Sequence, residues 1–586
     1  AFPFLTTTRS GFTKLAAVCI AILLGAVVWE LGWPLTRAEH EWSRLIAAVA
    51  TLGHLTGILG SYFRKEINRP SLRLLIFQII SCLMIFLLIA REQQEAGYMR
   101  FTELSRLVIT AGLIAIPTLM SLTRIFEWLV GKQKKGRPLM APAMQFVASL
   151  GVVILAGTGL LLLPNSTYPG ITLSFTDALF TSTSAVCVTG LNAVDFAHTF
   201  TPLGEMFTLA LIQIGGFGIM TFAYFVAMVA GQGFSLRDRV LLTDLLDEDN
   251  LGAVVSFITT IVVSTLFIEL CGTVLLYFSW EGKDINLMGE PLWWHSLFHS
   301  VSAFCNAGFS TFPMNLMEPG IRLCYSGQAV IMALIVCGGL GFGIYKEINS
   351  RLANRFFSKH RRLHMQWTPY FKLVMISTGI LLAGGALAIF AVSSPHAAEP
   401  LGEHLWICLF DSVTARTAGF NISDYGRYLP AASLIMCGLM MVGGSPGGTA
   451  GGMRTTTCAI AGAEILRILR GRDHVEFFRR RIDQRTVARC VITVVVSCAW
   501  IGCFTVLICA LEPSMSSLDI FFENCSAFAT VGVSRGITPD LSGPSKYFLI
   551  VNMLAGRVGL FAFLIALAGT PTPRHYRYPS VKIPLT

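Results

Sequence analysis

Four short strings of small and hydroxyl-bearing residues are the parts of this sequence that could do chemistry on an ion. Each string begins with Phe, carries Ser or Thr and then Ala four and five positions later, and reaches Gly ten positions after the Phe, or nine in the third string. The strings are FTSTSAVCVTGL (180–191), FHSVSAFCNAGF (298–309), FDSVTARTAGF (410–420) and FENCSAFATVGV (522–533). Their recurrence at a spacing of about 110 to 120 residues indicates an internal repeat, which decides the fold.

The chemistry that these strings suit is the binding of a dehydrated cation by backbone oxygens. A potassium ion that leaves water exchanges its hydration shell for other oxygens, and carbonyl groups supply them without a fixed negative charge. Glycine permits the necessary backbone angles, because a positive φ costs it little. The predicted filter residues are Val188, Thr189, Gly190, Asn306, Ala307, Gly308, Thr417, Ala418, Gly419, Thr530, Val531 and Gly532. We expect most of the hydroxyls, such as those of Ser182 and Ser184, to lie on a short helix and to hold the loop.

The elements that position these strings must lie in a membrane. Of the 586 residues, 54% are hydrophobic and only 13% are charged, which is far from the composition of a soluble protein. About 12 apolar runs have the roughly 20 residues that cross a bilayer. The net charge of +10 does not indicate nucleic-acid binding, because the basic residues gather in alternate short loops, as cytoplasmic loops do. These loops are 64–73, 131–137, 350–362 and 467–485, and we expect the N-terminus on the same side.

Each string lies between two apolar runs, which predicts a helix, a pore loop and a second helix. The runs before the strings are about 141–163, 252–279, 371–393 and 488–510, and those after them are about 203–231, 324–348, 429–466 and 544–569. Irregular backbone is tolerated at membrane depth only where protein or water surrounds it, so the four loops are expected to meet around one axis. The predicted fold is an all-α polytopic membrane protein with four such repeats around a central ion pore, plus about four N-terminal transmembrane helices.

The expected domain boundaries follow from these repeats. They are 1–137 for the N-terminal accessory helices, 138–250 and 251–365 for the first two pore units, 366–486 for the third with a broken helix, and 487–586 for the fourth with the C-terminal tail. Short pore helices would point their partly negative C-terminal ends at the cation. We expect them to begin near Asp177, Trp294, Trp406 and Asp519.

With TSTSAVCVTGL followed by LIQIGGFGIMTF (211–222), the chain resembles the Trk/Ktr/HKT superfamily of cation transporters over about 141–570. The resemblance implies potassium uptake by a Trk- or Ktr-like pore subunit, a homodimer, and in bacterial members a cytosolic ring of nucleotide-binding regulatory subunits. In this family, glycine at all four filter positions goes with potassium selectivity, whereas serine at the first goes with sodium transport. Gly190 therefore favours potassium.

Two interruptions of the apolar runs resemble the gate of this family. The stretch VGGSPGGTAGGMRTTT (442–457) cannot sustain a regular helix, so the span should break in mid-membrane. Its glycines are Gly443, Gly444, Gly447, Gly448, Gly451 and Gly452. Arg557 lies near the middle of the last run, where exposure to lipid is costly, and the resemblance places it in the pore beside this loop. A packing kink, and a buried arginine that satisfies carbonyl groups, are the alternatives.

These observations predict potassium uptake across the plasma membrane, the inner membrane of a bacterium, without enzymatic catalysis. We expect no cofactor and no metal except K⁺ at the filter carbonyls, since the fifteen cysteines lack the spacing of metal ligands. The basic segments 346–372 and 467–489 suit a regulatory ring and anionic membrane lipid equally. Arg416 is expected to pair with Glu523 or Asp411.

Two alternative functions remain open. One is a sodium-conducting or sodium-coupled transporter of the same fold. The other is a nucleotide-hydrolysing membrane pump subunit, which is disfavoured because GK[ST] is absent from the glycine cluster.

Overall fold

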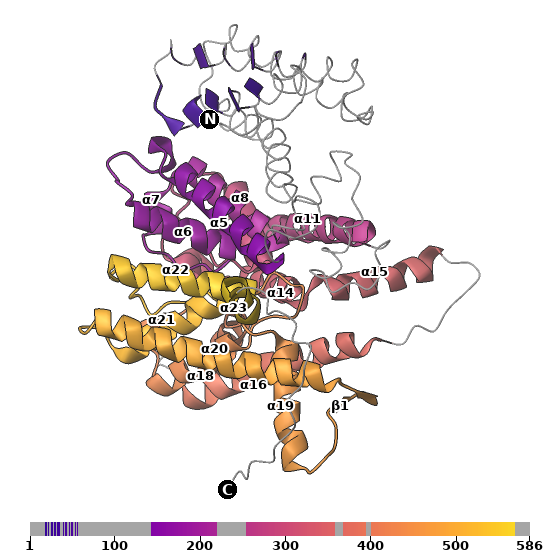
Figure 1. Cartoon of the computed structure of the whole chain (residues 1–586). Coiled ribbons are helices and arrows are strands. Elements are labelled where there is room, and N and C mark those ends of the chain that lie inside the picture. Colours follow the sequence, from indigo (N-terminus) through magenta and orange to yellow (C-terminus); the bar gives the residue numbers. More distant parts are fainter. Residues whose placement is uncertain are drawn as a thin grey trace.

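The fold repeats one succession of helices four times (Figure 1). The computed structural model describes residues 142–218, 254–357, 367–393 and 400–568, together with scattered residues between 18 and 56. Most of the predicted N-terminal helices therefore lie outside the described residues, as does the C-terminal tail beyond residue 568.

Each repeat consists of a first helix, a short helix and a second helix. The first helices are α5 (Pro142–Leu161), α11 (Val254–Trp280), α16 (Pro369–Val392) and α20 (Gln484–Leu511). The short helices are α6 (Phe175–Cys187), α12 (Leu292–Cys305), α17 (Leu401–Thr414) and α21 (Ser517–Ala529). The second helices are α8 (Pro202–Phe217), α14 (Tyr325–Leu340), α18 (Pro430–Met441) and α22 (Gly543–Val558). Asp177, Trp294 and Asp519 lie in the first turn of their short helices, close to the predicted starts, and Trp406 lies in the second turn of α17.

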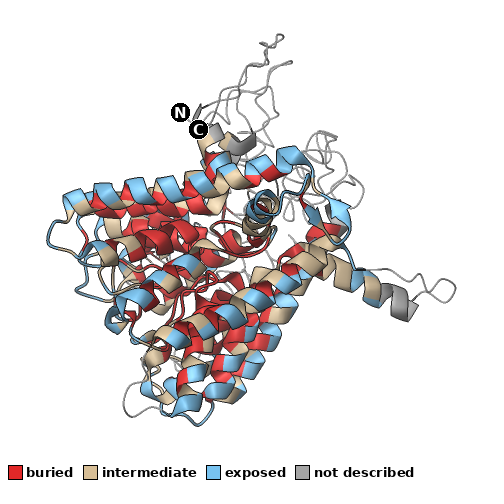
Figure 2. Cartoon of the chain, turned by 90° about the horizontal axis from the view of Figure 1, so that it is seen from below, coloured by how far each residue is buried: buried red, intermediate tan, exposed pale blue. Residues whose placement is uncertain are grey.

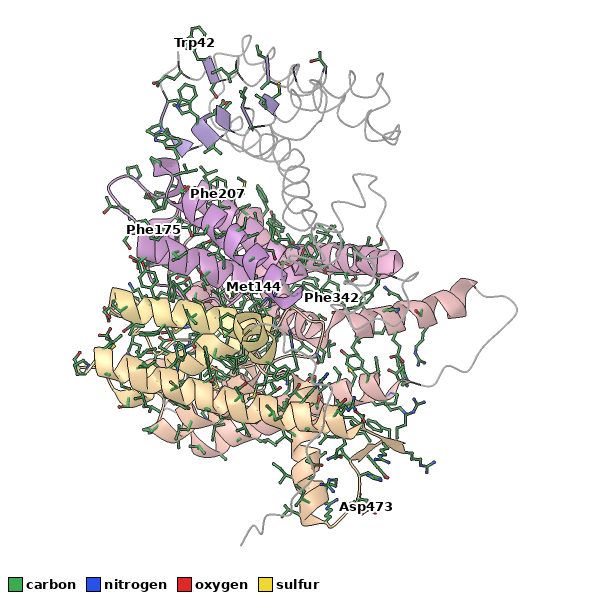
Figure 3. The ribbon with its side chains drawn as sticks, viewed as in Figure 1. Trp42, Met144, Phe175, Phe207, Phe342 and Asp473 are labelled. Carbon is green, nitrogen blue, oxygen red and sulfur yellow. The ribbon has the colours of Figure 1, made fainter. Side chains whose placement is uncertain are left out.

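Glycine breaks two second helices that the sequence analysis treated as single spans, 324–348 and 544–569. α14 and α15 (Phe342–Phe357) are bent by 93° at Gly341, whose φ is 89°. Figure 3 labels Phe342, the first residue after this bend. α22 likewise gives way to α23 (Leu560–Ala568) at Gly559, also with a φ of 89°. A residue with a side chain would be strained in this left-handed region, which explains why each helix turns at a glycine.

The third repeat breaks where its glycine cluster predicts. α18 ends at Met441 and α19 (Thr455–Leu469) begins after an irregular loop. A two-stranded hairpin follows, in which β1 (Glu476–Phe477) pairs antiparallel with β2 (Arg480–Arg481). The remaining connections contain η2 (Pro164–Ser166), α7 (Phe196–Thr199), η3 (Asn315–Met317), α13 (Pro319–Arg322) and η4 (Tyr425–Arg427).

The buried residues gather at the centre of the molecule (Figure 2). Many large apolar side chains are nevertheless exposed on its outside. Within the described part of the chain, α11, α16 and α20 are long and apolar enough to cross a membrane, and the bent pair α14–α15 would make a fourth span. Large side chains on their outer faces are exposed, as Phe278 at 68% and Val506 at 68% show. An exposed apolar surface of this extent suits lipid rather than water.

Candidate functional site

The short helices are anchored to the first helix of their own repeat by equivalent side chains. In each string, the residue two positions after the repeat phenylalanine donates a hydrogen bond to a carbonyl of that first helix. These bonds are Ser182 Oγ to Ile154 at 2.8 Å, Ser300 Oγ to Glu269 at 2.6 Å, Ser412 Oγ to Leu382 at 2.9 Å and Asn524 Nδ2 to Ile501 at 2.8 Å. The sequence analysis missed this pattern, although the fixed distance from the phenylalanine was a signal for it.

The hydroxyl four positions after each repeat phenylalanine holds the loop that follows. Ser184 Oγ accepts a hydrogen bond from the Gly190 N–H at 3.0 Å, and Ser526 Oγ accepts one from Gly532 at 3.0 Å. In the other two repeats, Ser302 Oγ donates to the Phe309 carbonyl at 2.9 Å and Thr414 Oγ1 donates to the Phe420 carbonyl at 2.6 Å. The hydroxyls therefore lie behind the loops and shape their backbones, as the sequence analysis expected for Ser184.

All four loops share an unusual backbone conformation. The glycines have φ values of 92°, 70°, 82° and 95° at Gly190, Gly308, Gly419 and Gly532. The residues two positions before them are also left-handed, with φ values of 59°, 62°, 70° and 51° at Val188, Asn306, Thr417 and Thr530. Non-glycine residues seldom adopt a positive φ, so its occurrence at the same place in four strings shows that the four loops share one geometry. The residue between each pair does not have a positive φ, so the left-handed conformation alternates along each loop.

The third string reaches this backbone differently because it is one residue shorter. α17 ends at Thr414, and the residue after it, Ala415, is still right-handed. The first left-handed residue is Thr417, whereas in α6, α12 and α21 the left-handed residue directly follows the helix. The shorter spacing therefore does not change the position of Gly419 relative to Thr417.

The four glycines form a closed ring. A Cβ atom placed on each glycine would lie against the carbonyl oxygen of the residue before the next glycine, and the fourth would meet the first string. The distance from this added Cβ atom to the carbonyl oxygen is 2.3 Å for Gly190 and Ala307, 2.7 Å for Gly308 and Ala418, 2.7 Å for Gly419 and Val531, and 2.1 Å for Gly532 and Thr189. All twelve predicted filter residues are therefore brought together around one axis, and a side chain at any of the four glycines would displace a neighbouring carbonyl.

The gate loop, residues 442–453, packs against this ring and the helices around it. Ser445 N–H donates to the Gly339 carbonyl at 3.0 Å, and Thr449 Oγ1 donates to Phe304 at the end of α12 at 3.3 Å. A Cβ atom on Gly451 would lie 2.0 Å from Thr530 Oγ1, which places the loop directly beside the fourth string.

The six glycines of the gate loop have two kinds of reason to be glycine. Gly447 and Gly452 have positive φ values of 69° and 67°. The other four lie against neighbouring atoms. A Cβ atom would be 2.0 Å from Gly451 O at Gly443, 2.3 Å from Ala450 Cβ at Gly444 and 3.1 Å from Gly338 O at Gly448, and at Gly451 it would meet the Thr530 side chain described above. The loop is thus tightly folded, which a phosphate-cradling loop in solvent would not require.

Arg557 connects the gate loop to the first repeat. Its guanidinium donates to the carbonyl of Thr449 in the loop and to the carbonyl of Gly215 in α8. Arg557 is half-buried, and the alternative of an arginine that satisfies carbonyls therefore holds together with a position beside the loop. Its bonds place a positive charge between two repeats on the side of the ring that faces the gate loop.

Arg416 does not pair with an acid, contrary to the expectation from sequence. Its Nη2 donates to the Gly443 carbonyl at 3.3 Å, and no ion pair to it occurs among the described residues. Asp411 accepts hydrogen bonds from Tyr425 and Tyr428, and Glu523 accepts them from Ser534 and Thr538. Both oxygens of Asp411 thus accept from hydroxyl groups nearby in the chain, as buried polar groups usually do. Glu523 accepts both of its bonds at Oε1, and its buried Oε2 has no hydrogen-bond partner in the described part of the chain.

The fold and the ring of carbonyls define an all-α membrane transporter. The chain belongs to the TrkH cation transport protein family, whose model matches residues 109–578. This confirms the resemblance found in the sequence. Among the described residues, no group of three or more His, Cys, Asp and Glu side chains could hold a metal ion.

Curated relatives support the family, and a solved structure supports the fold. The chain is 34% identical over 446 residues to the Ktr system potassium uptake protein B of Bacillus subtilis, with 74% of this chain and 94% of that protein covered. It is 32% identical over 466 residues to the potassium/sodium uptake protein NtpJ of Enterococcus hirae, with 77% and 99% covered. The crystal structure of the potassium transporter TrkH from Vibrio parahaemolyticus has a TM-score of 0.57 and 16% identity, and covers 95% of this chain and 99% of its own, so it is similar in fold.

Proposed function

We propose that the protein takes up potassium ions across the plasma membrane through a filter formed by the four strings. The observation that carries this proposal is the closed ring of glycines, in which the carbonyls of Thr189, Ala307, Ala418 and Val531 lie around one axis. Carbonyl oxygens in such a ring replace the hydration shell of a potassium ion. The buried hydroxyls of Thr189 and Thr530 have no hydrogen-bond partner in the described part of the chain, and this leaves them able to face an ion.

Potassium is the favoured cargo for two reasons. All four positions carry glycine, the pattern that goes with potassium selectivity in the family. The two related proteins from Bacillus subtilis are named as potassium uptake proteins. A sodium-conducting transporter is the second candidate, because the Enterococcus hirae relative is named for both ions.

The gate consists of the gate loop and Arg557. The loop lies beside the fourth string, and a fixed positive charge next to it opposes the passage of a cation. Conduction therefore requires the loop to move and the two hydrogen bonds of Arg557 to break. The glycine-rich sequence suits this movement, since glycine can adopt more backbone conformations than any other residue.

The surroundings of the pore are proposed from sequence and charge. The N-terminus and the basic loops face the cytoplasm, and the chain forms a homodimer in the inner membrane of a bacterium with a regulatory ring of nucleotide-binding subunits beneath it. The exposed arginines of the hairpin region suit such a ring or anionic lipid. They are Arg470, Arg472, Arg479, Arg480, Arg481 and Arg485.

Expression in a cell that lacks its own potassium uptake tests the proposal. At low external potassium the chain should restore growth, and excess sodium should not compete with the uptake. The variant Arg557→Ala, which we expect to conduct without a regulatory subunit, gives a second chance of rescue. Failure of both proteins to restore growth, although both are present in the membrane, would refute potassium uptake. Sodium uptake at an equal rate would favour the second candidate.

A further inference from the structure

In each repeat, the fourth residue of the second helix reaches toward the short helix of the next repeat. These residues are Glu205 in α8, Gln328 in α14, Ser433 in α18 and Lys546 in α22. All four are buried, with at most 8% of each residue exposed. Buried polar groups are costly unless they are hydrogen-bonded, so their common position calls for partners.

Each of these residues has its partner on or beside the neighbouring short helix. Trp294 Nε1 donates to Glu205 Oε2 at 2.7 Å, and Trp406 Nε1 donates to Gln328 Oε1 at 2.6 Å. Arg535 Nη1 donates to Ser433 Oγ at 2.6 Å, while its Nε binds Asp519 Oδ1 in α21 at 2.6 Å. Lys546 Nζ binds Asp177 Oδ1 in α6 at 2.8 Å. These four contacts, named here the outer ring, join repeat 1 to 2, 2 to 3, 3 to 4 and 4 to 1.

The contact between Lys546 and Asp177 differs from the other three. It joins residues 369 positions apart, between the last and the first repeat, where no short stretch of chain holds the two together. A second bond lies beside it, between Thr176 Oγ1 and Tyr547 Oη at 3.2 Å. The ion pair therefore closes a ring that the chain leaves open.

We propose that the outer ring positions the four filter loops, and that Lys546 and Asp177 are the positioning residues that close it. Each loop directly follows the C-terminal end of its short helix, so a shift of that helix carries the loop carbonyls with it. Because a carbonyl ring distinguishes ions by the arrangement of its oxygens, loss of one contact lowers discrimination between potassium and sodium. This inference rests on the proposed function of the filter.

The test compares three variants of the full chain reconstituted in lipid vesicles, with the potassium-to-sodium flux ratio as the readout. Lys546→Met removes the charge but keeps the length, and we expect the ratio to fall about threefold to tenfold. Lys546→Arg keeps the charge and should retain most of the ratio. Arg427→Met is the matched control, since it breaks an exposed ion pair with Asp424 that lies outside the outer ring, and should leave the ratio unchanged.

Trp406→Phe tests the same idea at another contact, because it removes only the N–H that binds Gln328. If Lys546→Met does not accumulate in the membrane, the flux ratio of Trp406→Phe alone tests whether the outer ring positions the filter loops. A lower ratio in Lys546→Met or Trp406→Phe, with the ratio of Arg427→Met unchanged, supports the outer ring. Ratios equal to that of the parent in both would overturn it. Gly190→Ser separates this result from the proposed function: if it lowers the ratio while the outer-ring variants do not, the filter stands and only the outer ring fails.

Discussion

The proposed filter and the proposed gate loop lie next to each other but are built on opposite plans. Around the filter, the same positions are used four times: two side chains of each short helix, a left-handed residue and a glycine. In the proposed gate, one loop comes from the third repeat alone and one arginine from the fourth. Equal contributions suit a ring that must hold an ion symmetrically, whereas a single asymmetric segment can move without distorting the ring.

The two regions are also held in different ways. The filter loops are held by buried hydroxyls on helices that are themselves anchored to a neighbouring helix. The gate loop is held by several hydrogen bonds to other elements, among them those from Ser445 N–H to the Gly339 carbonyl and from Tyr370 Oη to the Pro446 carbonyl, each worth about 1 kcal/mol net. Movement of this loop therefore has to break several of these bonds together.

The largest effect is expected at Arg557, where the gate depends on one side chain. Arg557→Ala removes two charge-assisted hydrogen bonds, each worth about 1.5 to 3 kcal/mol, so basal ion leak through vesicles should rise about tenfold or more. Arg557→Lys keeps the charge but cannot bind two carbonyls in a fork, and its leak should be intermediate. Flux equal to that of the parent in Arg557→Ala would remove the arginine from the gate.

A smaller effect separates the two hydroxyls of the first string. Ser184→Ala leaves the buried Gly190 N–H without its partner, at a cost of about 1 to 3 kcal/mol, and the potassium-to-sodium flux ratio should fall. Ser182→Ala removes only the bond from α6 to Ile154, so it should lower the melting temperature and should lower the ratio less than Ser184→Ala does. If both variants have the same ratio, the hydroxyl of Ser184 does not shape the filter.

The smallest effect is expected outside the membrane, at Glu512 after the end of α20. Hydrogen bonds from Ser542 and Ser545 hold the pKa of Glu512 below its usual range. A depressed folded-state pKa means that this stability is present above the unfolded pKa, about 4.3, and is lost as the pH falls through the folded value. The melting temperature of the parent should therefore decline more steeply below about pH 4.5 than that of Glu512→Gln. Identical slopes would show that the loop carboxylate does not stabilise the fourth repeat.

The sequence predicted that the four strings share one geometry and meet, because the repeat carries its own evidence. One string with a single glycine is ambiguous, but Gly190, Gly308, Gly419 and Gly532 recur at the same place between apolar runs. The break at 442–457 was also predictable, since a dense cluster of glycines and a proline cannot stay helical.

Other features depend on contacts between residues far apart in the chain. The bend at Gly341 was missed because glycine is frequent in membrane helices, and nothing in the sequence distinguishes Gly341 from Gly338, Gly339 and Gly343 beside it. The partner of Arg416 was predicted wrongly, since charge suggests an acid while the structure supplies the Gly443 carbonyl. Lys546 and Asp177 are 369 positions apart in the sequence, so no local pattern indicates the bond between them.

One measurement tests most directly whether four equivalent loops form the filter. Serine is placed in turn at Gly190, Gly308, Gly419 and Gly532, with Gly159→Ser as the control, because Gly159 is exposed and a Cβ atom there meets nothing within 4 Å. The account predicts that the potassium-to-sodium flux ratio in vesicles falls in all four variants, by about tenfold at Gly190, and stays unchanged in Gly159→Ser. A parental ratio in any of the four variants that reaches the membrane would contradict it.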